Sequence, residues 1–372
     1  MRVRAAVLPR TGARLEVDEL DLAPPGPGEV LVRLHASGVC HSDLNAIDGT
    51  AETRCPAVLG HEGAGVVEAV GPGVALTPGR RVVLSWLPAC GRCEECLRDL
   101  PHLCGEAWSG MMHGGLLDGT TRLSRGGEPV FHYCYVSTFA DRAVVPEGSC
   151  IPIPDDVPFE VAALVGCAVA TGIGAVWNTA RVRPGDRVAV IGCGGVGLSA
   201  VIGAASVGAS PVVAVDVAEE RLQAALEVGA TAAVRAGESA EESAAAVIDA
   251  SSGGVDYAFE ATGRADAMLA AFLSTRKRGA AVLIGIAAPD AVVALPAALV
   301  PRAERRLLGS AYGSVRPERD FPTILALYRR GRLPLDRLVS HHLPLEEIET
   351  AFDLMRERTS RRVVLDLGSP VS

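Results

Sequence analysis

Residues 187–216 read RVAVIGCGGVGLSAVIGAASVGASPVVAVD. The first five residues predict a buried strand, the small-residue run that follows predicts a helix, and residues 211–216 predict a second strand. Gly192, Gly194 and Gly197 form the pattern G-x-G-x-x-G between the first strand and the helix. In this pattern the first glycine permits a tight turn, the second lets the backbone approach a pyrophosphate, and the third lets the helix pack on the strand. The stretch therefore predicts a parallel, doubly wound sheet that binds a dinucleotide.

The remainder of the loop and the end of the second strand sharpen this prediction. Gly195 and Val196 would open the helix, whose N-terminus offers free N–H groups and the positive end of its dipole to phosphates. Asp216 ends the second strand, where a carboxylate can accept hydrogen bonds from both ribose hydroxyls and repel a 2′-phosphate. This arrangement favours NAD over NADP. In the alternative interpretation, Asp216 only caps the helix that follows it.

The pattern of elements changes along the chain. Residues 1–150 show short apolar strands separated by Gly/Pro turns, which is typical of a compact β-barrel-like domain, and strands then alternate with helices. The late strand RRVVLDL at residues 361–367 could return to the first domain. We therefore predict an α/β fold of two domains, a β-rich domain over 1–169 and 312–372 and a doubly wound domain over 170–311.

Composition narrows the class of protein. The 372 residues carry a net charge of −9, which argues against nucleic acid or an anionic membrane surface as the main partner. We find no N-terminal signal core and no run of ~18 uninterrupted apolar residues, so we expect a soluble, cytoplasmic protein. Lys277 is the only lysine among many arginines, which suggests a bacterial, high-GC source. Cysteines in such a compartment are expected to be thiols or metal ligands.

Four cysteines lie close together in CGRCEECLRDLPHLC, with the spacing C-x2-C-x2-C-x7-C. Four thiolates folded onto one point make a closed, tetrahedral structural zinc site. An iron–sulfur cluster is the rival interpretation, but a ferredoxin run expects Pro after its last cysteine, and here Gly105 follows. The predicted structural zinc ligands are Cys90, Cys93, Cys96 and Cys104.

A second metal site is suggested by three separate segments. Cys40 lies in GVCHSD, His61 in LGHEG and Cys167 in VGCAVATG. Spacing alone would not find this site, because no two of the three residues form a close pair. Together, two thiolates and one imidazole leave a fourth position open for water or substrate, and zinc with an open position acts as a Lewis acid on an alcohol or carbonyl oxygen.

With these motifs the sequence resembles the zinc-dependent medium-chain alcohol dehydrogenases, close to the liver-type branch. The resemblance covers nearly the whole chain and implies a GroES-like catalytic domain beside a Rossmann domain. It further implies that Ser42 carries the substrate proton, that Asp43 orients His61 through its other ring nitrogen, and that Glu62 lies behind the metal. The catalytic zinc ligands that it implies are Cys40, His61 and Cys167.

The resemblance also implies contacts to the cofactor and the substrate. His41 and Arg362 would contact the pyrophosphate, Arg221 would lie near the adenosine ribose, and Thr171 would face the nicotinamide ring. The substrate pocket would be lined by Trp86, Tyr133 and Cys134. In the alternative interpretation Trp86 and Tyr133 are plain core residues.

One residue departs from the family pattern. The proton relay of the family usually ends in a histidine three residues after Ser42, and this chain has Asn45 there. Asparagine cannot take a proton. Either proton release runs through water, or the physiological reaction does not need that base.

We therefore expect an NAD-dependent alcohol dehydrogenase with two zinc ions per chain. One alternative is a biosynthetic reductase of a C=N or conjugated C=C bond, motivated by Asn45. Another is a catalytically silent NAD- and zinc-binding scaffold, against which the intact metal ligands and Ser42 argue. The glutathione-dependent formaldehyde branch is disfavoured, because it has a basic residue soon after the fourth lobe cysteine and no arginine occurs here before Arg122. The long segment Gly105–Phe131 resembles the dimeric branch, so we expect a homodimer that could pair through a strand near Arg306–Tyr312.

Overall fold

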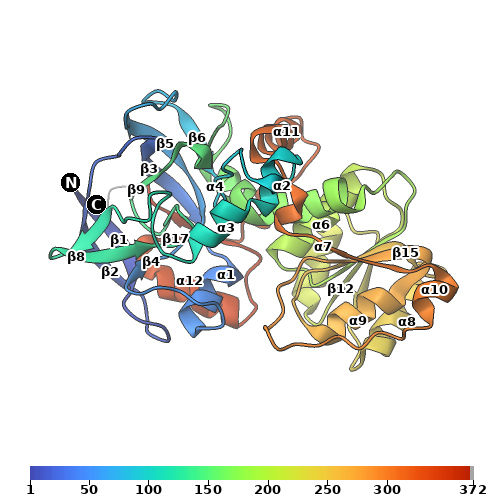
Figure 1. The fold of residues 1–372 in the computed structure, drawn as a ribbon. Coiled ribbons are helices and arrows are strands. Elements are labelled where there is room, and N and C mark those ends of the chain that lie inside the picture. The colour runs from blue at the N-terminus through green and yellow to red at the C-terminus, as the bar shows by residue number, and fades with distance from the viewer. Residues whose placement is uncertain (369–372) are drawn as a thin grey trace. The chain divides into compact units, whose positions relative to one another are not determined.

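The computed structural model describes residues 1–368, which divide into two compact units (Figure 1). Unit 1 comprises Met1–Cys167, Arg316–Arg329 and the segment from Val339 onward. Unit 2 comprises Ala168–Val315 and Arg330–Leu338. Three segments that we predicted in the β-rich domain thus fall in unit 2, namely 168–169, 312–315 and 330–338.

Unit 1 is built from a closed barrel and a larger sheet. The barrel has the strand order β1-β2-β7-β8-β4, and the sheet has the order β10-β6-β5-β3-β18-β17, with β9 also paired to β3. The late strand does return to this unit, because β18 pairs with β3. The strands are β1 (Arg2–Leu8), β2 (Glu16–Leu22), β3 (Glu29–Gly38), β4 (Ala57–Val58), β5 (Glu62–Val70), β6 (Arg81–Leu84), β7 (Leu123–Arg125), β8 (Glu128–His132), β9 (Arg142–Pro146), β10 (Cys150–Pro152), β17 (His341–Pro344) and β18 (Val363–Asp366).

The central strand of unit 1 is β3, and its pairing explains how the site is held. From Val30 to Gly38 this strand pairs antiparallel with β5, so that Gly38 lies opposite Glu62. A Cβ atom at Gly38 would lie 2.2 Å from Oε2 of Glu62, so only glycine leaves room for this carboxylate. The strand therefore places the residues just after Gly38 and just before Glu62 side by side.

Short helices join and cover these strands. In unit 1 they are α1 (His41–Asp48), α2 (Glu94–Leu97), η1 (Pro101–Leu103), α3 (Gly105–Met111), η2 (Glu147–Ser149), α4 (Phe159–Leu164), α11 (Pro317–Arg329), η7 (Leu345–Glu347) and α12 (Ile348–Arg356). Helix α12 has the most strongly amphipathic pattern and buries Ile348, Ala351 and Phe352 against a core that includes Phe139. This spacing of three and four residues is that of one helical face.

Unit 2 contains a six-stranded parallel sheet with the order β13-β12-β11-β14-β15-β16. This is the doubly wound order, in which the chain reverses direction across the sheet between β11 and β14. It confirms the predicted fold class. The strands are β11 (Val188–Ile191), β12 (Val212–Asp216), β13 (Ala232–Arg235), β14 (Val255–Glu260), β15 (Thr275–Leu283) and β16 (Arg306–Gly309).

The helices of unit 2 follow its strands, and Figure 1 shows α8 and α9 side by side against the sheet. Their buried alanines, Val247 and Phe272 belong to one apolar cluster with the sheet residues Val213 and Val215. The helices are α5 (Ala170–Gly174), η4 (Ala175–Ala180), α6 (Gly195–Ser206), α7 (Glu219–Glu227), α8 (Ala240–Ala250), α9 (Ala265–Ser274), α10 (Leu299–Ala303), η5 (Tyr312–Ser314) and η6 (Leu335–Leu338).

One continuous helical stretch, Phe159–Ala180, is long and apolar enough to cross a membrane by length and composition. Its most apolar window is 89% buried inside the protein, which marks it as a core helix. The stretch contains the π-helical turn η3 (Val165–Val169), which holds Cys167. Such turns widen a helix locally and occur often at functional sites.

Candidate active site

The first cluster of potential metal ligands lies in unit 1. Ligand atoms of Cys40, His61, Glu62 and Cys167 all lie within 4.8 Å of one another. The side chains of Cys40, His61 and Glu62 are almost fully buried. The structure thus brings together the three predicted ligands of the open zinc site, although they are far apart in the sequence.

Each donor is held by local structure. Cys40 is the N-cap of α1, and its backbone N–H donates to Oδ2 of Asp43 at 3.0 Å. The other oxygen of Asp43 is 3.0 Å from Nδ1 of His61 and also accepts the N–H of Gly60 at 3.2 Å. A carboxylate on one ring nitrogen fixes the tautomer and leaves Nε2 to bind a metal. Asp43 therefore has the orienting contact that we predicted.

The charges around the cluster favour metal ligation. The hydrogen bond between the two thiols holds the pKa of Cys40 well below its usual value and raises the pKa of Cys167, so Cys40 is the sulfur that loses its proton first. Thiolate is the form of cysteine that binds metals. The donor set of two sulfurs and one imidazole nitrogen matches zinc with one open coordination position. These residues therefore fit the catalytic metal of the predicted chemistry.

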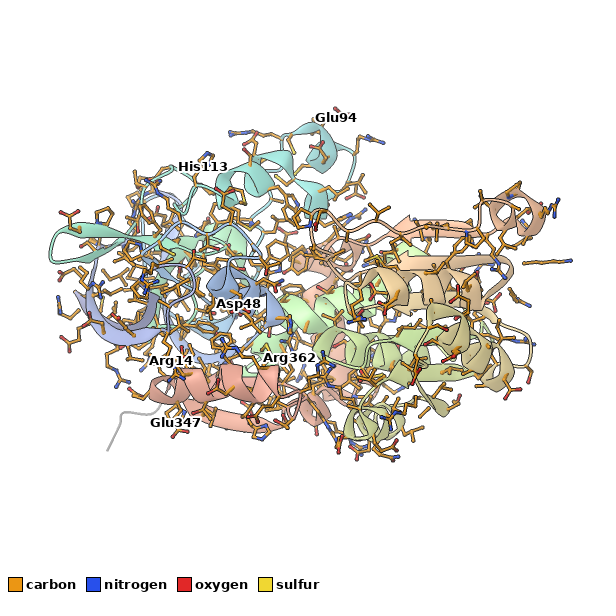
Figure 2. All side chains as sticks on the ribbon, turned by 90° about the horizontal axis from the view of Figure 1, so that it is seen from below. Arg14, Asp48, Glu94, His113, Glu347 and Arg362 are labelled. Atoms are coloured by element: carbon orange, nitrogen blue, oxygen red, sulfur yellow. The ribbon has the colours of Figure 1, made fainter. Side chains whose placement is uncertain are left out.

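Glu62 and Arg362 form a buried ion pair beside this cluster. Nη2 of Arg362 donates to Oε1 of Glu62 at 2.7 Å, and Nη1 donates to the carbonyl of Val39 at 2.8 Å. Burial raises the pKa of Glu62 to about 7, against the lowering effect of Arg362. Arg362, labelled in Figure 2, is only 6% exposed. Arg362 thus binds Val39 and Glu62 beside the donor cluster, and its predicted pyrophosphate contact stays a prediction.

The predicted proton carrier stands next to the donors. Oγ of Ser42 is 3.9 Å from Sγ of Cys40. Asn45 lies three residues further along α1, which places it on the same helix face as Ser42. His41 is exposed at the first position of the helix. The sequence motif therefore produces a compact turn with the reactive hydroxyl beside the metal ligands.

The predicted substrate-pocket residues divide into two groups. Tyr133 donates its hydroxyl to the carbonyl of Ser42 at 3.0 Å, and its ring meets His61 edge-on at 5.8 Å. Cys134 is buried, and desolvation raises its pKa to about 12, so it is a neutral thiol. Trp86 instead packs edge-on against Trp108 at 5.4 Å and borders an apolar core cluster. Tyr133 thus adjoins the donor cluster, and Cys134 follows it in the chain. The pocket role of Trp86, which is partly buried, stays a prediction.

The second metal cluster forms a lobe of unit 1, and Figure 2 shows Glu94 at its outer edge. Ligand atoms of its four cysteines lie within 4.8 Å of one another, with Sγ separations of 4.0 Å for Cys90–Cys96 and 3.8 Å for Cys93–Cys104. These separations are far too long for disulfides, and they match the edge of about 3.8 Å of a tetrahedron with ~2.3 Å zinc–sulfur bonds. The predicted four-cysteine site therefore has the geometry for a closed zinc site.

The glycines of the dinucleotide loop in unit 2 lie where a side chain would be strained, would clash or would fill open space. Gly192 has a φ of +92°, and a Cβ at Gly197 would lie 1.7 Å from the carbonyl oxygen of Gly192. At Gly194 no heavy atom of the described residues lies within 4 Å of such a Cβ, so the space in front of it is open. Gly195 and Val196 begin α6, whose N-terminal N–H groups follow directly.

Asp216 is buried at the end of β12 and has two backbone partners. It accepts the N–H of Cys193 at 2.8 Å and the N–H of Ala218 at 3.0 Å. The second contact closes a turn before α7, whose N-cap is Ala218 and has no side-chain cap, so Asp216 does not cap this helix. The first contact ties the carboxylate to the glycine loop. Arg221 lies on α7, and Thr171 lies on α5, which packs against α6.

Comparison with known proteins decides the family. Residues 26–155 match the model of the alcohol dehydrogenase GroES-like domain, and residues 195–330 match that of zinc-binding dehydrogenases. The chain is 39% identical to an S-(hydroxymethyl)glutathione dehydrogenase of Escherichia coli O1:K1 over 369 residues, which cover 98% of this chain and 100% of that protein. The chain belongs to the zinc-dependent medium-chain alcohol dehydrogenases.

Solved structures of other family members agree. An alcohol dehydrogenase zinc-binding domain protein from Burkholderia ambifaria is 35% identical, with a TM-score of 0.95 over 99% of this chain and 100% of that one. Benzyl alcohol dehydrogenase from Acinetobacter calcoaceticus is 32% identical, with a TM-score of 0.92. The match covers 98% of this chain and 99% of that one. This alcohol dehydrogenase therefore has the two zinc sites and the nicotinamide cofactor expected of its family.

Two features of the site escaped the sequence analysis. One is the pair of Glu62 with Arg362, which are 300 positions apart. The other is Tyr135, which is 1% exposed and follows the pocket residues Tyr133 and Cys134. A tyrosine two residues after another carries no motif, so only its contacts reveal what it holds.

Proposed function

We propose that this alcohol dehydrogenase uses NAD to interconvert an alcohol with an aldehyde or ketone, with Ser42 carrying the substrate proton. The observation that supports this most directly is the hydroxyl of Ser42, 3.9 Å from a sulfur of the open donor set Cys40, His61 and Cys167. A turnover screen with NAD against primary, secondary, aromatic and terpenoid alcohols tests it. Absence of NAD-dependent turnover on every class would refute the proposal.

Zinc held by Cys40, His61 and Cys167 would supply Lewis acidity toward the substrate oxygen, and NAD would supply the hydride chemistry. The residues of the chain hold the parts in place. Asp43 fixes the ring of His61, Arg362 balances the charge of Glu62, and Ser42 offers a hydroxyl that can pass a proton along α1. Tyr133 and Cys134 would line the substrate side of the site.

We do not favour glutathione adducts as substrates, although the Escherichia coli relative is named for its action on S-(hydroxymethyl)glutathione. Arg122, the first arginine after Cys104, is held by carboxylates: its guanidinium donates to both oxygens of Glu29 at 2.8 and 2.6 Å and to Asp118 at 2.6 Å. Its charge is therefore already balanced. The name of the benzyl alcohol dehydrogenase relative makes aromatic alcohols the first class to screen.

Cofactor preference should depend on Asp216. We expect NAD to be preferred over NADP by roughly tenfold or more, because a 2′-phosphate would displace or repel a buried carboxylate at a cost above ~1.4 kcal/mol. Asp216→Ser should relax this preference, as measured by kcat/KM with each cofactor. Because Asp216 also holds the N–H of Cys193, we expect KM for NAD to rise in the same variant. Equal efficiency of the wild-type enzyme with both cofactors would refute this role.

Proton release should lack its usual terminal base, because Asn45 cannot accept a proton. Asn45→His should therefore speed alcohol oxidation near neutral pH by up to roughly 10²-fold, the low end for a positioned general base. The effect is to be measured under conditions where a deuterium isotope effect shows that chemistry limits the rate. An unchanged rate would contradict the relay and favour the second candidate function, reduction of a C=N or conjugated C=C bond, which does not need that base.

We also propose that the protein forms a homodimer, that it is cytoplasmic and that it comes from a bacterium. The predicted edge strand β16 is the last strand of the parallel sheet, and Leu307 on it is 47% exposed. Pairing of this strand with its copy across a two-fold axis would close the open edge. We expect a light-scattering mass near twice the 38.5 kDa of one chain. A mass near that of one chain or of four would count against the dimer, and secretion into the medium would count against the location.

A further inference from the structure

The segment Tyr133–Ser137, directly after β8, has an unusual backbone. Cys134, Tyr135 and Ser137 have positive φ values of 49°, 63° and 42°. This region of backbone space is unfavourable for residues that carry a side chain. Such strain persists only where the surroundings hold the segment in place. The contacts of this segment therefore show what fixes it.

Two tyrosine hydroxyls anchor the segment in different directions. Tyr133 donates to the carbonyl of Ser42 at 3.0 Å, in the first turn of α1. Tyr135 donates to the carbonyl of Ala107 at 2.7 Å, in the first turn of α3. The backbone N–H of Tyr133 also donates to Oγ of Ser137 at 3.0 Å, which closes the strained loop on itself. The segment is thus tied at one side to the reactive turn and at the other to the helix after the cysteine lobe.

The anchor at Tyr135 is tightly packed. Tyr135 is 1% exposed, and a Cβ at Gly110 would lie 2.3 Å from its hydroxyl oxygen, so the ring end lies directly on the backbone of α3. The N–H of Ala107 in turn donates to Sγ of Cys104 at 3.5 Å, and Cys104 is the N-cap of α3. One series of contacts therefore runs from the fourth cysteine of the lobe, through Ala107 and Tyr135, to Tyr133 and Ser42.

We propose that Tyr135 and Tyr133 are positioning residues that use the four-cysteine lobe as a fixed anchor for the turn carrying Ser42. The lobe then sets the geometry of the reactive turn in addition to stabilising the fold. Within residues 1–368 the side-chain hydrogen bond of Tyr135 is to Ala107 and not to the donor cluster, so Tyr135 acts through Tyr133. The kinetic part of this proposal rests on the proposed function, whereas the mechanical tie can be measured without turnover.

Hydrogen exchange in Tyr135→Phe tests the tie, because this change removes only the hydroxyl that reaches Ala107. In the zinc-loaded protein, we expect amides in the first turn of α1 to exchange roughly threefold to tenfold faster, the size of one lost hydrogen bond. Strands β11 and β14 of unit 2 should exchange as in the wild type. Tyr257→Phe, on β14, is the matched control and should leave α1 unchanged.

Kinetics test the consequence. Tyr135→Phe and Tyr133→Phe should each lower kcat by a similar factor with little change in KM, because the misplaced Ser42 affects the reaction more than binding. The double variant should be no slower than the more damaging single one, since both hydroxyls act through one segment. If Tyr135→Phe fails to fold, Tyr133→Phe carries the exchange measurement, because it removes only the hydroxyl that reaches the carbonyl of Ser42.

Three results would overturn the proposal. The first is unchanged exchange in α1, the second is a rise of equal size in all strands, which would mean general destabilisation, and the third is faster exchange in α1 with an unaltered kcat. If the wild-type enzyme oxidised no alcohol with NAD, the proposed function would fail on its own. The exchange experiment would then still decide whether the lobe holds the turn of Ser42.

Discussion

Cys40→Ser is expected to lower alcohol oxidation by roughly 10³-fold or more. Lewis-acid stabilisation by a catalytic metal is worth several kcal/mol, and about 1.4 kcal/mol corresponds to each tenfold in rate. Cys40 supplies one of the two thiolates in the open donor set. A serine hydroxyl is not deprotonated near neutral pH, so the remaining Cys167 and His61 would hold zinc poorly.

The same variant should keep its fold. Serine is among the preferred N-cap residues, so it suits position 40 at the start of α1. Its backbone N–H can still donate to Asp43 as that of Cys40 does. Metal analysis should therefore give about two zinc equivalents in the wild type and about one in the variant, with an unchanged circular dichroism spectrum.

Cys55→Ser is the matched control for this experiment. Cys55 is a half-buried thiol outside both metal clusters and contacts the carbonyl of Thr53. Its replacement should leave zinc content and activity near wild-type values. Full activity of Cys40→Ser, or loss of both zinc ions from it, would show that the catalytic assignment is wrong.

Cys96→Ser is expected to have its main effect on stability. None of the residues of α2, which carries Cys96, is buried, and Leu97 is 75% exposed, so the lobe has little apolar core of its own. The free energy of zinc binding takes the place of that core, because the binding energy of a structural site is folding energy. Structural zinc binds with ~10–16 kcal/mol, and a variant that loses this zinc should lose at least a quarter of that, about 3 kcal/mol, from its free energy of unfolding.

Denaturant unfolding with zinc analysis measures this loss. Cys96→Ser should retain close to one zinc ion and unfold at lower denaturant, whereas Cys40→Ser should shift the midpoint much less. Each variant thus loses one zinc ion, but Cys40→Ser mainly loses activity and Cys96→Ser mainly loses stability. An unchanged free energy of unfolding in Cys96→Ser would mean that the lobe does not depend on its metal.

The sequence predicted the two architectures but not every element. Strands with a continuous apolar run, such as β11 and β12, were located within one or two residues. Strand β2, EVDELDL, has no clear pattern in the sequence, because its acidic residues face solvent and hide the alternation. The four-residue strands β13 and β17 are too short to show a period, and each becomes a strand only by pairing.

What the sequence alone determined was chemistry carried by closely spaced residues. The glycine loop and the four cysteines each lie within 15 residues and use local backbone geometry, so spacing is enough to predict them. Tertiary structure decided what depends on long-range pairing. It brings Arg362 to Glu62, joins Cys40, His61 and Cys167, and links Tyr135 to the cysteine lobe. Such contacts follow from strand register and side-chain packing, which involve residues far apart in the sequence. No short sequence pattern predicts them.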